Sequence, residues 1–160
     1  MEPPSSSLIS LLNPFDEVVD EALIERAALS ALPESSREVC ILLTDDDGIR
    51  ELNQRFRGID SPTDVLSFPG DGFPNSPLGD IAISVPYARR QAELREVSLD
   101  QELAYLAIHG ALHLIGWDDQ TDDEQERMVA EMNRIALLAG LPPDEAWHSL
   151  LQGAQARSER

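Results

Sequence analysis

Two histidines spaced four residues apart are the clearest candidates for chemistry in this chain. His109 and His113 lie in the stretch HGALHLIGWDD, and the 160-residue chain contains only three histidines. On a helix, an i, i+4 spacing brings two imidazoles together, as metal ligation requires. Gly116 can adopt a left-handed conformation and turn the chain sharply, so that a residue three positions further on folds back toward the histidines. That residue is Asp119.

The complete pattern is H-x3-H-x2-G-x2-D, which offers three protein ligands and leaves a fourth position open. Because this coordination is that of a catalytic zinc ion rather than a structural one, we predict one Zn²⁺ per chain held by His109, His113 and Asp119. A histidine pair without further ligands also occurs on exposed helix faces, and His148 is an alternative third ligand. The other acids of DDQTDDE are interpreted as a helix start favoured by the macrodipole.

The residue that follows the first histidine argues against peptide hydrolysis. In zincin proteases a glutamate at this position is the general base, and here the position holds Gly110. The proton acceptor must therefore lie elsewhere, or a metal-activated hydroxide must react directly. A metallopeptidase is the less favoured enzyme alternative.

The composition is that of a globular protein, with 42 % hydrophobic and 26 % charged residues. A net charge of −18 argues against binding nucleic acid through a basic field over the whole surface. Residues 50–95, however, hold six arginines and six acids, so a local basic surface is compatible with the sequence. No apolar run approaches a bilayer span, and the start of the chain lacks the features of a secretory signal. The single cysteine, Cys40, is interpreted as a small buried hydrophobe, and we expect a cytoplasmic protein with no membrane partner.

Hydrophobic periodicity and capping signals predict an α+β fold, a single domain with a small mixed sheet packed by helices. Helices are expected at residues 16–32, 44–57, 86–95, 98–115 and 121–140, and strands at 7–12, 37–44, 63–69 and 80–85. Capping boxes, Ser98 with Gln101 and Thr121 with Glu124, open the last two helices. The domain is predicted to span residues 7–152, with residues 1–6 and 153–160 disordered. Residues 69–79 form a loop long enough to act as a substrate flap.

The helix at residues 98–115 carries both histidines, and its apolar positions predict which face is buried. At roughly 100° per residue, the two histidines lie about 100° from the centre of the apolar stripe. The stripe consists of Leu103, Leu106, Ala107, Gly110 and Leu114.

Three stretches together resemble the YbeY family of bacterial endoribonucleases in their order and spacing. They are LNQRFRGIDSPTDVLSFP at residues 52–69, LGDIAIS at residues 78–84 and the histidine stretch at residues 109–119. The resemblance spans about residues 37–140. It implies a zincin-like α+β fold with a zinc site, and a single-strand-specific, metal-dependent endoribonuclease. The implied role is 16S rRNA 3′-end maturation and ribosome quality control, with single-stranded ribosomal RNA and small ribosomal subunit proteins as partners.

One residue departs from the family's pattern, which generally ends in a third histidine where this chain has Asp119. Aspartate is a competent zinc ligand. Its negative charge would make the metal a weaker Lewis acid and raise the pKa of bound water relative to three histidines. A ribosome-assembly factor with a structural metal and little activity is therefore the main alternative to an active nuclease.

The resemblance also implies a functional arginine at Arg57, so we predict that Arg57 and His109 are catalytic. A guanidinium can clamp a phosphate at two points and stabilise charge that builds on it during cleavage. The alternative is a surface arginine paired with Asp60.

Two further pairs of charged residues are candidates for supporting roles. Asp64 and Asp80 are interpreted as turn formers rather than as partners that orient a histidine. Arg89 and Arg90 are candidates for contacts with the RNA backbone.

Overall fold

The structure is a computed structural model that describes residues 8–34, 37–73 and 76–143. The segments predicted to be disordered, residues 1–6 and 153–160, lie outside the described residues, as does His148. Part of the 69–79 loop, residues 74–75, is also outside them, and no observation tests the loop as a flap.

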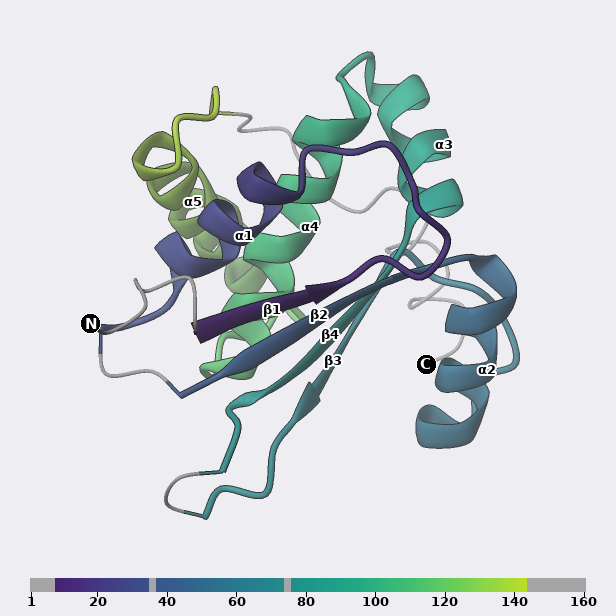
Figure 1. Cartoon of the computed structure of the whole chain (residues 1–160). Helices are drawn as coiled ribbons and strands as arrows, with labels where there is room; N and C mark the ends of the chain where they lie inside the picture. Colours follow the sequence, from purple (N-terminus) through teal and green to yellow (C-terminus); the bar gives the residue numbers. More distant parts are fainter. Residues whose placement is uncertain (1–7, 35–36, 74–75, 144–160) are drawn as a thin grey trace, which may run out of the picture.

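A four-stranded mixed sheet forms the centre of the described part of the chain, in the order β1-β2-β4-β3 (Figure 1). Strands β1, β2 and β4 are parallel, and β3 runs antiparallel to β4 at one edge. The strands are β1 (Ile9–Leu12), β2 (Val39–Thr44), β3 (Val65–Pro69) and β4 (Gly79–Ser84). The helices are α1 (Glu21–Ala31), α2 (Asp46–Arg57), α3 (Val85–Arg95), α4 (Leu99–Leu114) and α5 (Asp122–Leu138). The predicted α+β fold with a small mixed sheet is confirmed.

The two faces of the sheet carry different apolar residues, because successive strand residues point to opposite sides. Ile41, Ile81 and Ile83 face the main core, which α1, α4 and α5 complete. Ala82 and Leu66 face the other way and form a smaller cluster with Ile49 of α2. Figure 1 shows α2 on the opposite side of the sheet from α1, α4 and α5.

Cys40 lies on the less covered face of β2, and it is less buried than the expectation of a small buried hydrophobe implied. Its neighbours Val39 and Ile41 are buried in the main core, whereas Cys40 is only half-buried. The reason is the alternation of side chains along a strand together with the limited extent of α2.

Helix α4 is the central helix of the domain, and it is buried on more sides than an amphipathic stripe would require. All five residues of the predicted stripe are buried, but so are Glu102, Tyr105, Ile108 and His109. The helix approaches β4 closely at Gly110, where an added Cβ would lie 2.8 Å from Cγ2 of Ile81. A glycine is therefore required for the helix to pack at this distance from the sheet.

The ends of several elements differ from the prediction. Helix α1 begins at Glu21 rather than residue 16, since Asp16 has a φ of 53° and Asp20 provides the N-cap. Val85 begins α3 rather than ending β4. The Ser98 cap on α4 is confirmed, but the side chain of Gln101 contacts the hydroxyl of Tyr105 instead of completing a capping box.

A buried polar network joins α3, α4 and the start of β3. Arg95 forms an ion pair with Glu102, and the side-chain amide of Gln91 donates to Glu102 at 3.0 Å and to Asp64 at 3.1 Å. Asp64, Gln91 and Glu102 are fully buried. Asp64 therefore links elements of the core, and its interpretation as a turn former is wrong. The same interpretation is wrong for Asp80, an exposed residue paired within the β4 ladder.

Within the described residues, no helix has the length and apolar character that a membrane crossing requires.

We predict that Arg95→Met lowers the free energy of unfolding by about 3–5 kcal/mol, because it leaves the buried carboxylate of Glu102 without its cation. Urea unfolding monitored by circular dichroism measures this change. The matched control is Arg134→Met, which breaks the exposed pair with Glu131 and should leave the midpoint nearly unchanged. Equal shifts for both variants would contradict a structural role for the buried network.

Candidate metal centre

The two histidines project from the last two turns of α4 toward the same point. Their ring centroids lie 4.5 Å apart with an interplanar angle of 85°, and the two Nε2 atoms are separated by 3.1 Å. His109 is buried, and His113 is half-buried. The i, i+4 spacing thus produces the predicted pair, with both Nε2 atoms turned to one site.

The chain reverses after α4 and brings a carboxylate back to the same point. Gly116 has a φ of 103°, and the amide of Trp117 donates to the carbonyl of Leu112 at 3.0 Å. After this turn, Oδ2 of Asp119 lies 3.4 Å from Nε2 of His109 and 3.5 Å from Nε2 of His113. The predicted role of Gly116 in the reversal is confirmed.

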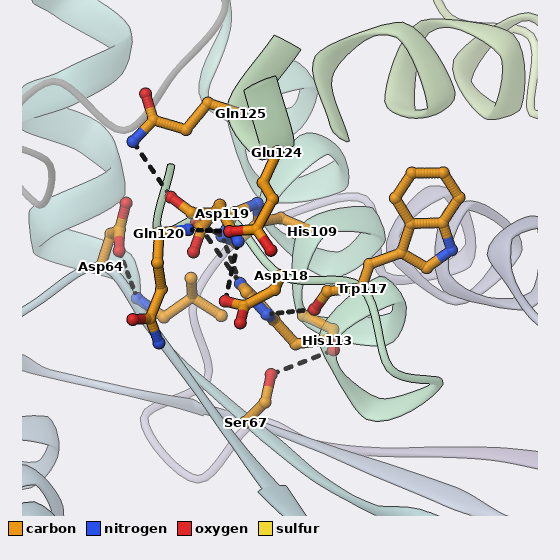
Figure 2. Close-up of polar contacts among 12 residues, drawn as sticks. Asp64, Ser67, His109, His113, Trp117, Asp118, Asp119, Gln120, Glu124 and Gln125 are labelled. Atoms are coloured by element: carbon orange, nitrogen blue, oxygen red, sulfur yellow. Dashed lines mark hydrogen bonds and ion pairs between the residues drawn. The ribbon is translucent and has the colours of Figure 1, made fainter. Parts of the chain in front are cut away.

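The start of α5 holds this loop in place (Figure 2). Glu124 accepts from the amides of Gln120 and Thr121, and the hydroxyl of Thr121 accepts from the amide of Glu124, so the predicted capping box is present. The side-chain amide of Gln125 donates to the carbonyl of Asp119 at 3.0 Å. The loop that carries Asp119 is therefore fixed at both ends, by α4 and by α5.

The spacing of the three donor atoms fits a single tetrahedral ion. Zinc bonds to nitrogen and oxygen ligands of roughly 2.0–2.1 Å place neighbouring ligand atoms about 3.3–3.4 Å apart. The observed separations are 3.1, 3.4 and 3.5 Å. Two imidazole nitrogens and one carboxylate oxygen are also ligand types that zinc accepts. The residues present therefore suit a zinc-type ion with one further position for a non-protein ligand.

Burial keeps one histidine neutral, and a hydrogen bond orients the other toward the site. Nδ1 of His113 lies 3.0 Å from the carbonyl of Trp117, which can only accept, so the proton belongs on Nδ1 and the Nε2 lone pair faces the site. Burial lowers the pKa of His109 to about 3, and the nearby His113 adds to this effect. The carboxylate of Asp119 acts in the opposite direction and is outweighed.

Strand β3 borders the site. The hydroxyl of Ser67 donates to the carbonyl of Gly110 at 3.0 Å, which ties this edge strand to α4 between the two histidines (Figure 2). The ring of Trp117 points away from the histidines in Figure 2. A cavity of about 350 Å³ is lined by residues 115–118 and by Glu124 and Arg127.

Arg57 is not among the residues that the structure brings together with the histidines. It is the exposed last residue of α2, followed by Gly58 in the left-handed conformation that the sequence predicted. The expected alternative partner, Asp60, binds Arg50 at 2.8 Å instead, and the Arg50 guanidinium lowers the pKa of the Asp60 carboxyl. Within the described ranges, neither an ion pair nor a hydrogen bond engages Arg57.

The other two arginines singled out in the sequence are paired. Arg89 lies 3.4 Å from Glu17, and Arg90 lies 2.9 Å from Asp46 and stacks over Tyr87. Their charges are therefore partly neutralised by the protein itself, which weakens their candidacy for contacts with an RNA backbone.

Two groups at the site were not found by the sequence reasoning. One is the main-chain carbonyl of Trp117, which orients His113, and the other is Gln125, which holds the backbone of Asp119. A backbone carbonyl leaves no mark on residue type. Gln125 had a weak signal, since it follows the capping-box glutamate on the first turn of a helix whose start was predicted.

We predict that the His109 imidazole of the metal-free protein stays neutral from pH 8 down to about pH 4, because its pKa is lowered to about 3. The unfolded chain gains a proton near pH 6.5 that the folded chain does not bind. This site's contribution to stability is therefore full above about pH 6.5 and is lost as the pH falls toward 3. Nitrogen chemical shifts of the ring, measured by NMR after chelator treatment, report the titration. A midpoint near 6.5 would show that His109 is not shielded from water as the structure indicates.

Known proteins resemble the chain over most of its length. The family model described as Endoribonuclease YbeY matches residues 8–139. A relative from Wolinella succinogenes named Endoribonuclease YbeY is 44 % identical over 135 residues, covering 84 % of this chain and 93 % of the relative. Another of that name from Bradyrhizobium diazoefficiens is 43 % identical over 135 residues, covering 76 % and 74 %. The solution structure of TM1509 from Thermotoga maritima matches with a TM-score of 0.56 at 26 % identity, covering 82 % of this chain and 88 % of that one. The chain belongs to the YbeY family, whose matching model is described as an endoribonuclease.

Proposed function

We propose that this protein is a metal-dependent endoribonuclease that cleaves single-stranded RNA, with one zinc ion held by His109, His113 and Asp119. The observation that carries the proposal is the spacing of the three donor atoms, 3.1 to 3.5 Å, which matches the edges of a tetrahedral zinc site. Membership of the YbeY family and the name shared by its relatives support RNA as the substrate.

The protein's own residues prepare the site for this chemistry before any ligand arrives. Burial keeps His109 neutral, the carbonyl of Trp117 fixes the tautomer of His113, and Asp119 adds one negative charge beside the two imidazoles. A zinc ion bound there would supply a Lewis acid for the scissile phosphate and lower the pKa of a coordinated water. We assign His109 a catalytic role through this contact with the reacting centre.

Arg57 is proposed to stabilise the phosphate during cleavage. Its guanidinium has no ion-pair partner among the described residues, so no internal carboxylate competes for the substrate. A planar guanidinium matches two phosphate oxygens, and its charge stabilises the negative charge that develops in the transition state.

Peptide hydrolysis is disfavoured by the packing at Gly110, the position at which zincin proteases carry their general base. An added Cβ at this residue would already lie 2.8 Å from Ile81, so a longer side chain there would disturb the core. A phosphodiester substrate is consistent with a site that lacks that glutamate.

In the cell, we propose that the protein acts in the cytoplasm in 16S rRNA 3′-end maturation and ribosome quality control. A net charge of −18 favours docking to basic proteins of the small ribosomal subunit over binding to isolated RNA. The second candidate is an assembly factor with a structural metal and little activity. The observation that favours it is the carboxylate of Asp119, whose negative charge weakens the Lewis acidity of a bound ion.

We predict that Arg57→Ala reduces the rate of RNA cleavage by roughly a hundredfold, the scale for losing one donor that stabilises transition-state charge. Arg57→Lys should restore little of this rate, because an ammonium lacks the two-point contact. The assay is cleavage of a single-stranded RNA by zinc-loaded protein at matched metal content. Arg55→Ala is the control, since Arg55 lies on the same exposed helix end but already pairs with Glu51.

The wild-type protein without metal should be inactive in the same assay and should regain activity on addition of zinc. Equal rates for wild type and both Arg57 variants would remove Arg57 from the mechanism. Absence of cleavage by zinc-loaded wild type would support the assembly-factor alternative instead.

A further inference from the structure

Phe56 is an exposed aromatic residue directly before Arg57, and it does not belong to the main core. It is 61 % exposed, although it lies on the last turn of α2, a helix that otherwise packs against the sheet. Its ring meets the ring of Phe68 of β3 edge-on, with centroids 5.3 Å apart and an interplanar angle of 61°. Such edge-to-face contacts fix ring orientation as well as burying apolar surface.

Phe68 gives this exposed ring a rigid support. It is half-buried and packs against the small cluster that Ile49, Leu66 and Ala82 form beneath α2. The edge-on contact uses only part of the surface of Phe56, which accounts for the large exposed fraction. An aromatic side chain fixed in this way can stack on a flat ligand at little cost in side-chain entropy.

The charged residues near Phe56 in the sequence are less acidic than the chain as a whole, which suits contact with a negatively charged phosphate backbone. Asp60 is neutralised by Arg50, and Glu51 is neutralised by Arg55. Arg57 has no such partner among the described residues. Arg57 thus leaves one uncompensated positive charge next to the exposed ring in sequence, in a protein whose net charge is −18.

Strand β3 connects the Phe56–Phe68 pair to the candidate metal centre. Ser67 points to one face and bonds the carbonyl of Gly110 between the two histidines, while the adjacent Phe68 points to the other face and contacts Phe56. In the described sheet β3 pairs only with β4, so its other edge carries no strand. The β3 edge thus lies between the histidines on one face of the sheet and the aromatic pair on the other.

We propose that Phe56 is a stacking subsite for one unpaired nucleobase of the RNA substrate, with the adjacent phosphate contacted by Arg57. The inference rests on the proposed endoribonuclease function and adds a substrate contact to it. Stacking on an aromatic ring beside a cation is a common way to hold single-stranded nucleic acid, and it tolerates different bases. It also requires an unpaired base, which would give the protein a preference for single strands.

The test is a cycle that combines protein variants with RNAs that each lack one base. Cleavage rates are measured for a short single-stranded RNA and for a set of otherwise identical RNAs that each contain one abasic position. The zinc-loaded proteins compared are wild type, Phe56→Leu and Phe56→Met. Both variants keep an apolar contact with Phe68 but lose the flat ring. Phe56→Tyr keeps the ring, and Phe15→Leu is the control for removing an aromatic residue that is 55 % exposed elsewhere.

At one position near the cleaved bond, we expect removal of the base to reduce kcat/KM of wild type and Phe56→Tyr roughly tenfold or more. The same base removal should have little effect on Phe56→Leu and Phe56→Met, because the stacking partner is already lost. A purely structural role for Phe56 would not depend on which base is missing. Phe15→Leu should behave as wild type.

Equal effects of base removal in wild type and in both Phe56 variants, at every position, would overturn the proposal while leaving the nuclease function intact. Failure of zinc-loaded wild type to cleave any of the RNAs would overturn the proposed function and the stacking subsite together.

Discussion

The close packing of α4 on β4 at Gly110 is the constraint on which the site depends. An added Cβ at this position would lie 2.8 Å from Ile81, so the helix sits nearer the sheet than a larger residue would permit. This places His109 in the buried interior, where its pKa falls to about 3 and its nitrogen remains available to a metal. The same contact excludes a glutamate from the position of the protease base. One packing contact therefore buries a candidate ligand and leaves no room for the protease glutamate.

The third donor depends on a different physical effect, the reversal of the chain at Gly116. A positive φ of 103° is strained for residues with a side chain, and the turn delivers Asp119 to within 3.5 Å of both imidazoles. The capping box of α5 and the Gln125 side chain then hold the loop. Because the proposed third ligand is a carboxylate, it would bring a negative charge that partly offsets that of a bound divalent ion.

Local sequence patterns predicted those features that depend on interactions between residues close together in the chain. The histidine spacing, Gly116, the Thr121–Glu124 box and Gly58 are short-range signals, and the structure confirms the geometry that each implies. The pattern could not reveal contacts between residues far apart in the chain. Asp64 was misread because one of its partners, Gln91, lies 27 positions away. The Phe56–Phe68 contact was missed because it joins helix α2 to strand β3. Cys40 was misread because the sequence does not say how much of a sheet face a helix covers.

The central claim is that His109, His113 and Asp119 form one preorganised site for a zinc-type ion. The most direct measurement is the anomalous difference density of crystals of the full chain grown with zinc, recorded on either side of the zinc absorption edge. We predict a single strong peak about 2.0–2.2 Å from Nε2 of His109, Nε2 of His113 and Oδ2 of Asp119. A peak bound by His148 in place of Asp119, or no peak between the two histidines, would contradict the claim.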